Sequence, residues 1–402
     1  MSNSTHSNNP QQAFPTLAQT MPTDAAQAVL IGRLWVPGLG PHLVRVTFDA
    51  VHDLSALALT CSDLLELDNP AEKVKQHIGK VLCSTALAVA NSQPCLRKPE
   101  HPWFLAPCDL QAIKAAGVTF VASMLERVIE EQARGDAGKA ESVRQAVVSV
   151  MGEDLASVVP GSPQAMKLKE VLIAQGVWSQ YLEVGIGPDA EIFTKSQAMS
   201  SVGFGADVGL HPGSVWNNPE PEIVLAINSK GQVHGVSMGN DVNLRDFEGR
   251  SALLLGKAKD NNASCSIGPF IRLFDAHYSI DDVRQTELAM TVQGPEGFVM
   301  QGSSSLRLIS RDPLDLAAQA IGANHQYPDG LVLFLGTMFA PTQDRHGPGL
   351  GFTHVVGDTV AISTPQLGSL FNRVTTSDQA PPWTYGVRSL MRDLAQRARP
   401  LA

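Results

Sequence analysis

Charged side chains are scarce in this chain of 402 residues. They make up 17% of the residues, whereas about 25% is usual for a soluble domain. Hydrophobic residues make up 44%, so we expect much buried surface, in a core and in an interface between subunits. The net charge is −9 and no basic stripe offsets it, which disfavours nucleic acid as a partner.

Cysteine pairs and long apolar runs are also missing. The five cysteines are scattered and contain no CxxC pair, which argues against a disulfide framework or a zinc knuckle and fits a reducing cytoplasm. The N-terminal segment has no basic stretch followed by an apolar one, and no apolar run reaches the ~20 residues that a membrane span needs. We therefore expect a cytoplasmic protein with no membrane partner.

The pattern of the chain predicts a tail, a small domain and a larger domain. Residues 1–25 are rich in Asn, Gln, Ser, Thr and Pro and are expected to form a disordered tail. Residues 26–105 contain short β-branched runs around a Pro-Gly-Leu-Gly-Pro turn, which predict a small N-terminal α+β domain. Residues 106–402 form the larger domain, with a helical segment at 121–150 whose charged residues are expected to face water. After Tyr181, short strands between Gly and Pro turns indicate a mostly-β domain, so the fold class is α+β.

Three carboxylates lie at the ends of a predicted hairpin. The alternation in PEIVLAI, the turn NSKGQ and the run VHGVSMG predict two paired strands. Glu220 and Glu222 are two residues apart and so share a face of a strand, and Asp241 ends the next strand. Carboxylates this close repel one another unless a divalent cation such as Mg²⁺ or Mn²⁺ binds them. The alternative is that Glu220 and Glu222 form the exposed face of an edge strand.

Five segments follow one another in the order found in a known superfamily. They are NNPEPEIVLAIN, GNDVNLRDFEGRS, AKDNNASCSIGPF, LVLFLGTMFAP and GFTHVVGDTVAISTPQLGSLFNRV. Together they resemble the successive motifs of the fumarylacetoacetate hydrolase superfamily, over about Leu105–Val374. The resemblance implies that residues 106–402 are a catalytic domain with a rolled β-sheet core, and that the protein is a homodimer. It also implies that Mg²⁺, or Mn²⁺ in its place, is bound by Glu220, Glu222 and Asp241.

The lysine motif indicates one branch of that superfamily, which contains C–C hydrolases, decarboxylases and dehydratases. Its hydrolases usually have K-x-x-D followed by an aromatic residue, whereas Asn262 occupies the aspartate position here and Ser264-Cys265 replaces the aromatic segment. The pattern A-K-x-x-x-x-S-C-x-x-G-P instead resembles the branch that dehydrates 2-keto-3-deoxy sugar acids. In that branch a glutamate and a lysine serve as acid and base. The matching residues are Glu191 and Lys259, and which of the two takes the C3 proton stays open.

Other residues are expected at the substrate. Thr337 in LGTMF resembles a threonine whose hydroxyl contacts the carboxylate end of the substrate, and the alternative is a buried threonine bonded to the backbone. Arg245 either binds a substrate carboxylate or pairs within the protein with Asp246 or Glu248. Two residues of the segment EIFTK, which matches a family strand beside the metal, are expected to line or support the pocket: Phe193 and Lys195.

The chemistry that these residues suggest is the loss of water from a small 2-keto acid. A cation on the C1 carboxylate and C2 carbonyl lowers the pKa of the C3 protons, after which the C4 hydroxyl leaves. Such a cation also lowers the pKa of a nearby lysine, and a glutamate in a dry position stays protonated. Our first hypothesis is a hydro-lyase that converts 2-keto-3-deoxypentonate to 2,5-dioxopentanoate. The second is a hydrolase that splits a 2,4-diketo acid and releases pyruvate, and a non-catalytic homologue is disfavoured because the expected acid, base and metal ligands are all present.

Overall fold

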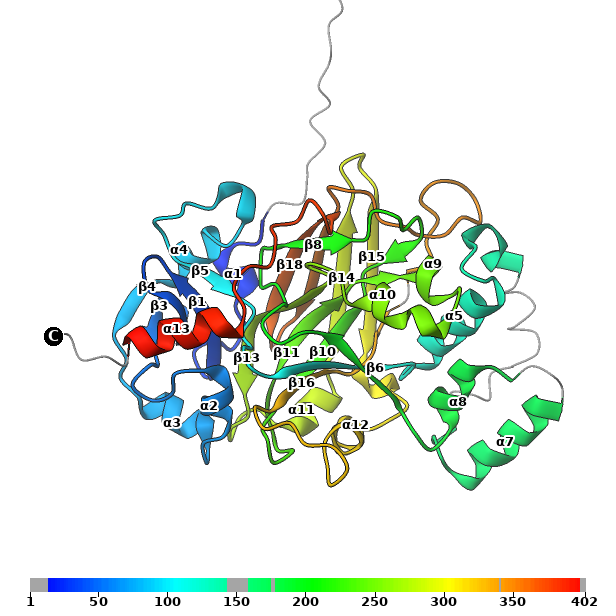
Figure 1. Cartoon of the computed structure of the whole chain (residues 1–402), viewed down its shortest axis with the longest axis horizontal. Coiled ribbons are helices and arrows are strands. Elements are labelled where there is room, and N and C mark those ends of the chain that lie inside the picture. Colours follow the sequence, from blue (N-terminus) through cyan, green and yellow to red (C-terminus); the bar gives the residue numbers. More distant parts are fainter. Residues whose placement is uncertain (1–13, 143–157, 175–177, 340, 398–402) are drawn as a thin grey trace, which may run out of the picture.

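Two β-sheets form the centre of the protein, with helices at either end (Figure 1). The computed structural model describes residues 14–142, 158–174, 178–339 and 341–397. In this part of the chain the largest hydrophobic cluster draws side chains from both sheets, so the main core lies between them. The expected α+β class with a mostly-β core is confirmed.

The larger sheet has eleven strands among the described residues, and ten of them follow one path: β4 (Val81–Ser84), β3 (Ala50–Asp53), β2 (Gly40–Val46), β1 (Leu30–Val36), β13 (Cys265–Leu273), β11 (Val233–Asp241), β10 (Pro221–Ile227), β16 (Leu331–Phe334), β6 (Ala112–Gly117) and β7 (Glu191–Ser196). The eleventh, β5 (Trp103–Leu105), pairs with β1. Because β1 also pairs with β13, the sheet continues across the predicted domain boundary at residue 105. The N-terminal and larger parts therefore share one sheet.

The second sheet is a five-stranded layer in the following order: β15 (Val299–Ser305), β14 (Glu287–Gln293), β17 (Thr359–Thr364), β18 (Gly368–Thr376) and β8 (Asp207–Leu210). Strand β14 alternates buried and more exposed residues, as expected for a strand with one face on the core. Beside the sheets, β9 (Asn217–Asn218) pairs with β12 (Asn243–Leu244). This short pair comes directly before and after the hairpin β10–β11, and so lies next to the carboxylates that the sequence singled out.

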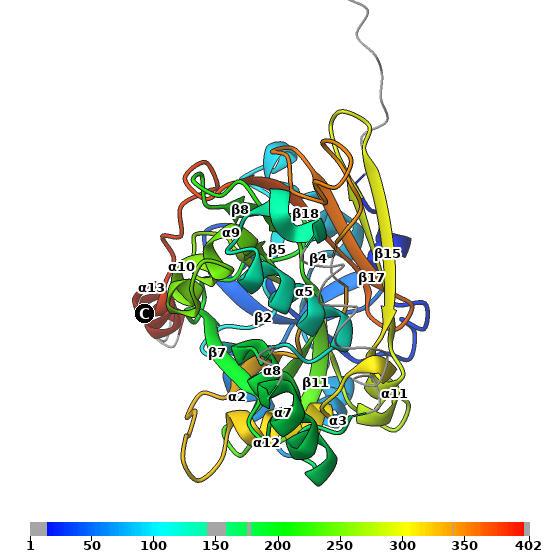
Figure 2. The same ribbon diagram turned by 90° about the vertical axis from the view of Figure 1, so that its right-hand side faces the viewer.

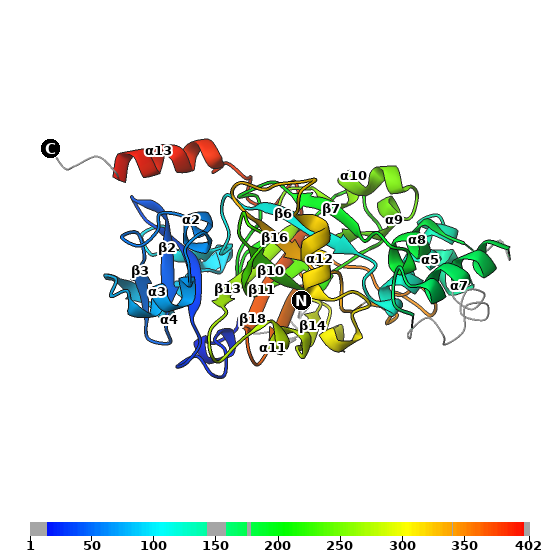
Figure 3. The same ribbon diagram turned by 90° about the horizontal axis from the view of Figure 1, so that it is seen from below.

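The helices are described in three groups, of which two lie at opposite ends of the molecule (Figures 1 and 2). The N-terminal part carries α2 (Cys61–Leu65), α3 (Pro70–Gln76), α4 (Thr85–Ala90) and a 3₁₀ turn (Pro94–Leu96). The end that holds the site carries α5 (Val121–Gln132), α7 (Pro163–Ala174), α8 (Gln180–Ile186), α9 (Arg245–Glu248), a 3₁₀ turn (Ala252–Leu254) and α10 (Leu255–Lys259). The remaining helices are α1 (Leu17–Thr20), α11 (Ile280–Arg284), a 3₁₀ turn (Leu306–Leu308), α12 (Pro313–Ala320) and α13 (Val387–Arg397). Figure 3 shows α13 lying over the N-terminal strands, where Arg397 donates to the carbonyl of Pro41 at 2.7 Å. Among the described residues no helix is both long and apolar enough to span a bilayer.

The expected tail is shorter than the sequence suggested. Residues 14–25 are placed against the second sheet, and the ring of Phe14 lies 5.2 Å from that of Phe204 and 5.3 Å from that of Phe371. Helix α1 begins with a capping box in which Thr16 is the N-cap, and Met21 is buried in the main core. The packing of Phe14 and the helix cap at Thr16 therefore hold this stretch against the sheet despite its polar composition. Residues 1–13 lie outside the described part of the chain.

The helical segment expected at 121–150 is broken. Helix α5 ends at Gln132, and the next residues turn through Arg134 and Gly135, which have φ of 54° and 71°. A left-handed pair of this kind ends a helix, because it cannot continue the right-handed hydrogen-bond pattern. The chain is helical again from residue 137, and residues 143–150 lie outside the described part.

Candidate active site and metal centre

The predicted carboxylates meet where the hairpin begins and ends. Pro221 pairs with Asn240 across the two strands, and the backbone N–H of Asp241 donates to the carbonyl of Glu220 at 2.9 Å. One carboxylate oxygen each of Glu220, Glu222 and Asp241 lies within 4.8 Å of the others. The convergence predicted from the strand period is therefore confirmed. The alternative of an exposed edge strand is wrong, because β10 lies between β11 and β16 and all three side chains are buried.

The three carboxylates have the donor set of a hard divalent cation. Glu222 accepts a hydrogen bond of 2.7 Å from the backbone N–H of Gly336, and no lysine or arginine of the described chain forms an ion pair with it. Burial raises the pKa of Glu222, and the neighbouring Asp241 and Glu220 raise it further. A buried carboxylate without a positive partner is costly unless it is protonated or bound to a cation. Glu222 therefore fits a Mg²⁺ or Mn²⁺ ligand, together with Glu220 and Asp241.

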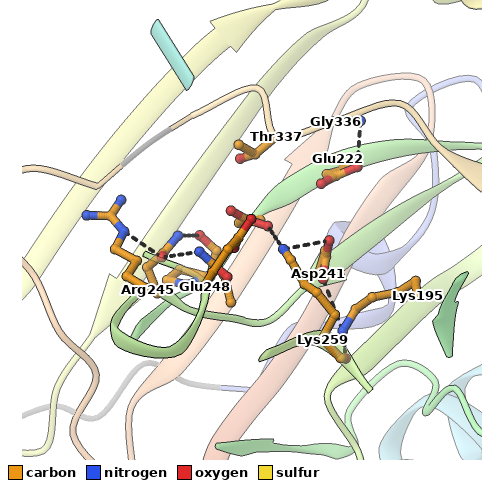
Figure 4. A network of polar contacts seen from close by, with 12 residues as sticks. Lys195, Glu222, Asp241, Arg245, Glu248, Lys259, Gly336 and Thr337 are labelled. Atoms are coloured by element: carbon orange, nitrogen blue, oxygen red, sulfur yellow. Dashed lines mark hydrogen bonds and ion pairs between the residues drawn. The ribbon is translucent and has the colours of Figure 1, made fainter. Parts of the chain in front are cut away.

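Two buried lysines, Lys259 and Lys195, bring positive charge to these carboxylates (Figure 4). Lys259 Nζ lies 2.5 Å from Glu220 Oε2 and 3.1 Å from Asp241 Oδ2. Burial opposes the charge of Lys259, but the Asp241 and Glu220 carboxylates outweigh that effect and raise the pKa of its amine. The lowered pKa expected from the sequence thus requires the charge of a bound cation, since the carboxylates by themselves act in the opposite direction.

Lys195 supports the site from within the protein. Its ammonium donates to the carbonyl of Lys259 and to Ser264 Oγ, and it lies 3.1 Å from Asp241 Oδ1. These contacts fix the end of α10 and one oxygen of a candidate metal ligand. Despite the burial of Asp241, the ammonium groups of Lys195 and Lys259 hold the pKa of that carboxyl below its usual value. Phe193 lies on the same strand β7, and its ring centre is 5.8 Å from Lys259 Nζ.

Glu191 begins strand β7 and faces a separate hollow beside the carboxylates. Strand pairing sets it opposite Gly117, where a Cβ would lie 2.0 Å from Glu191 Oε2. Burial raises the pKa of Glu191 to about 7, and the charge of Glu248 contributes in the same direction. A carboxyl group with this pKa can hold a proton at neutral pH and also release it, as a general acid or base must.

An arginine that the sequence analysis did not select connects these groups. Arg127, on α5, donates to Glu220 Oε1, and its Nη1 lies 2.7 Å from Glu130 Oε2 and 3.2 Å from Glu248 Oε2. The expectation that the charges of this helix face water is wrong for Arg127 and Glu130, which are buried. The only local signal was their spacing of three residues, which places both on one face of the helix.

Arg245 belongs to the same network but has other partners than expected. Its Nε lies 3.1 Å from Glu130 Oε1 and donates to Asn218 Oδ1 at 2.8 Å, and its Nη1 donates to the carbonyl of Pro341. The carboxylate of Asp246 instead accepts hydrogen bonds from Ser214 Oγ and from the N–H of Val215, and Glu248 pairs with Arg127 as described above. The protein pairing suggested for Arg245 is therefore corrected from Asp246 or Glu248 to Glu130 and Asn218.

Thr337 lies in the loop after β16, above the carboxylates in Figure 4. Its hydroxyl donates to the carbonyl of Phe339 at 2.9 Å, a backbone bond like that of the structural alternative. The preceding Gly336 has φ of 97°, and a Cβ there would lie 2.0 Å from Thr119 Oγ1. Glycine is thus required at this position for the backbone N–H that holds Glu222.

Asn262 has a structural reason to differ from aspartate. Its side-chain amide donates to the carbonyls of Ser377, at 3.0 Å, and Pro381, at 3.2 Å. An aspartate has no proton to donate to these carbonyls when ionised. Asn262, at the position where the hydrolase pattern has aspartate, therefore anchors the segment that leads to α13.

Comparison with known proteins shows which family and which relatives the chain is similar to. Residues 183–375, which hold the carboxylate triad and Lys259, match the model described as fumarylacetoacetate (FAA) hydrolase C-terminal, so this part of the chain is similar to that family. A probable 2-keto-3-deoxyxylonate dehydratase of Haloferax volcanii is 29% identical over 196 residues, which are 49% of this chain and 64% of the relative. A 2-dehydro-3-deoxy-D-arabinonate dehydratase of Saccharolobus solfataricus is 27% identical over 184 residues, 46% of this chain and 58% of the relative. The chain thus spans about three fifths of the length of these two relatives.

Solved structures share the fold. A 2-keto-3-deoxy-D-arabinonate dehydratase complexed with magnesium and 2,5-dioxopentanoate has a TM-score of 0.61 at 18% identity, with 86% of this chain and 99% of that chain covered. A 5-carboxymethyl-2-hydroxymuconate delta-isomerase from Mycobacterium smegmatis has a TM-score of 0.51 at 18% identity, with 86% and 98% covered. At these identities the likeness establishes the fold.

Proposed function

We propose that this protein is a metal-dependent dehydratase of 2-keto-3-deoxy sugar acids, and that 2-keto-3-deoxypentonate is its substrate. The observation that carries the proposal is the meeting of Glu220, Glu222 and Asp241 with Lys259, with Glu191 near enough for the charges of Lys259 and Glu220 to affect its pKa. Relatives named as dehydratases of such acids support it. A related fold holding magnesium and 2,5-dioxopentanoate supports the choice of Mg²⁺ and of the product.

The reaction removes one molecule of water. The C3–H and C4–O bonds break, and the proton and the hydroxyl leave together as water. The double bond then moves from C3–C4 to C4–C5 as C5 loses a proton and C3 gains one. The resulting enol gains a proton at C4 and loses its hydroxyl proton, which gives the C5 aldehyde of 2,5-dioxopentanoate. A divalent cation on Glu220, Glu222 and Asp241 would polarise the C1 carboxylate and the C2 carbonyl, which makes the C3 proton more acidic. Glu191 and Lys259 move the protons, and Thr337 and Arg245 border the carboxylate end.

The second candidate, a C–C hydrolase of 2,4-diketo acids, needs a base that activates water. The described residues that line the two hollows beside the carboxylates include no histidine. His354 follows the Thr337 loop in the sequence, and its Nδ1 is hydrogen-bonded to Asp358 at 2.7 Å. No specific observation favours the hydrolase, so the dehydratase is the function that we propose.

The test is product analysis with the metal removed and restored. After chelation, the protein should be inactive on 2-keto-3-deoxypentonate, and Mg²⁺ should restore formation of 2,5-dioxopentanoate. Glu222→Gln should abolish the restored activity, whereas Glu287→Gln, on the exposed side of β14, should not. Release of pyruvate from a 2,4-diketo acid, with no semialdehyde from the deoxy sugar acid, would overturn the proposal in favour of the hydrolase.

We further propose a homodimer in the cytoplasm, with Mg²⁺ as the resident cation and Mn²⁺ able to replace it. All five cysteines are free in the structure, which supports a reducing compartment. The dimer is proposed from the low charged fraction and the family resemblance. Light scattering at micromolar concentration should give twice the mass of the chain, and a monomeric mass would contradict the dimer.

A further inference from the structure

A cavity of about 130 Å³ opens beside Glu191. Its polar wall comes from Gln180 and Tyr181 on α8, from Glu191, and from Glu248 on α9, while Val184, Ala252 and Leu255 complete it. Gln180 and Ala252 are exposed, so the cavity reaches the surface, whereas Glu248 is buried at its inner side. A second hollow, which Glu220, Thr337 and Arg245 line, measures only about 10 Å³. Of the two, only the larger cavity has room for the tail of a substrate.

Glu248, which lines the inner side of this cavity, has one carboxylate oxygen without a hydrogen-bond donor among the described residues. Glu248 Oε2 lies 3.2 Å from Arg127 Nη1, but it accepts no hydrogen bond from any described residue. Buried carboxylates normally have their hydrogen bonds satisfied, and the Glu248 carboxylate, which accepts few from the protein, suits a neighbouring group that can donate to it. A hydroxyl group can donate to it, whereas a second carboxylate cannot and is repelled.

The charges of the connected network lead to the same conclusion. Its five carboxylates, those of Glu130, Glu220, Glu222, Asp241 and Glu248, face four cations, those of Arg127, Lys195, Arg245 and Lys259. All nine side chains are buried. One negative charge is left over, so a divalent cation reverses the balance to one positive charge. A ligand with a single carboxylate then neutralises the site, and a ligand with two does not.

We propose that Glu248 is a specificity-determining residue that admits 2-keto acids with a neutral, hydroxylated tail and excludes those whose tail ends in a carboxylate. This inference rests on the proposed function, because it places the 2-keto acid head at the carboxylate triad. Glu191 shares the same wall, but the selection is assigned to Glu248, whose carboxylate is held by the ion pair with Arg127 and whose Oε2 accepts no hydrogen bond from any described residue.

The first experiment measures binding and involves no turnover. The ligands are 5-hydroxy-2-oxopentanoate and 2-oxoglutarate, which differ only at C5 and have no C4 hydroxyl to lose. Calorimetry with the Mg²⁺-loaded protein should show that the hydroxylated ligand binds at least about tenfold more tightly, as expected for a carboxylate placed near a buried like charge. Glu248→Gln should remove most of that ratio by strengthening the binding of 2-oxoglutarate.

Two further variants separate selection from structural damage. Glu248→Asp keeps the charge and should keep the discrimination. Glu287→Gln, on the exposed side of β14 and outside the network described above, also removes one carboxylate, and the binding ratio should change by less than about threefold. Equal binding of the two ligands to the unmodified protein, or an unchanged ratio in a folded Glu248→Gln variant, would overturn the inference.

The second experiment compares substrates. With 2-keto-3-deoxypentonate and 4-hydroxy-2-oxoglutarate, which again differ only at C5, kcat/KM should favour the neutral tail in the unmodified protein and much less so in Glu248→Gln. Loss of dehydration for both substrates, with the binding ratio intact, would count against the proposed reaction and leave the selection standing. Failure of both ligands to bind would instead count against a 2-keto acid site, and the inference would fall with it.

Discussion

Lys259 and Glu220 are joined by a hydrogen bond of 2.5 Å between Nζ and Oε2, on a carboxylate that is also a candidate metal ligand. The same amine lies 3.1 Å from Asp241 Oδ2. Two of the three candidate ligands therefore already bind a positive charge from the protein. Because like charges repel across a buried site, the lysine and a bound cation influence each other directly.

Replacing this lysine should separate metal binding from catalysis. Lys259→Met keeps the length and apolar stem of the side chain but removes the amine, so Mg²⁺ should bind at least as tightly as before. The kcat for dehydration should fall by the ~10²–10⁴-fold typical of a lost acid or base. Lys257→Met, on the exposed side of the same helix, is the matched control and should retain both properties. Calorimetry with Mg²⁺ and steady-state kinetics measure the two effects, and turnover near that of the unmodified protein would remove Lys259 from the mechanism.

The pKa of Glu191 predicts a pH dependence. Burial raises this pKa to about 7, and as the acid that donates to the leaving hydroxyl Glu191 must carry a proton. The kcat should therefore be constant below about pH 6 and fall about tenfold per unit well above pH 7. A limb that rises with pH through the same midpoint would instead identify Glu191 as the C3 base.

The same shift has a consequence for stability. The pKa in the folded protein lies above the ordinary glutamate value of 4.5, so the proton favours the folded state. This contribution is complete below about pH 4.5 and is lost as the pH rises to about 7. Glu191→Gln should lack that part of the pH dependence in thermal unfolding, and an unchanged slope would contradict the raised pKa.

Much of the candidate metal centre could be predicted because its geometry is local. Two glutamates two residues apart share one face of a strand, and a hairpin with a short turn returns Asp241 to the same end. The order of the motifs then supplied Glu191 and Lys259, which no spacing rule connects. Their placement near the triad came from the resemblance, and the contacts of Lys259 agree with it.

The surrounding network could not be predicted, because its contacts join distant parts of the chain. Arg127 and Glu220 are 93 residues apart, and the charges of α5 follow the pattern of an ordinary solvated helix face. Nothing local distinguishes a charged residue that faces water from one that meets a buried partner on another element. The length of the tail could not be predicted for the same reason, since the aromatic partners of Phe14 are the distant residues Phe204 and Phe371.

Gly336 offers a test of the backbone contact to Glu222. Gly336→Ala must adopt a left-handed backbone and also displace Thr119 Oγ1, so the loop should shift and its N–H should move away from Glu222. Gly349→Ala has a similar positive φ but nothing within 4 Å of the added Cβ, and so controls for backbone strain, about 1–2 kcal/mol. Mg²⁺ affinity should fall by about tenfold in Gly336→Ala, as for the loss of one outer hydrogen bond to a ligand, and stay unchanged in Gly349→Ala. Equal affinities in the two variants would show that this N–H does not hold the ligand.

Arg127 gives the last prediction, because it binds one candidate metal ligand and the wall of the substrate cavity at once. Arg127→Met leaves the buried carboxylates of Glu130, Glu220 and Glu248 with one cation fewer, and breaking a buried ion pair in this way costs about 3–5 kcal/mol. Arg127→Lys keeps one positive charge but cannot reach three carboxylates with a planar fork. The midpoint temperature of thermal unfolding should therefore be lower in the Met variant than in the Lys variant.

In the Lys variant, which is expected to fold, the Mg²⁺ concentration for half-maximal activity should rise, while kcat at saturating Mg²⁺ should recover most of its value. That split is expected of a residue that orients Glu220, since excess metal compensates for a poorly held ligand. Arg134→Met, at the exposed end of the same helical segment, should change neither quantity. If Arg127→Lys lowered kcat at every Mg²⁺ concentration and left the half-maximal concentration unchanged, Arg127 would act on the reacting groups and not on the metal ligand.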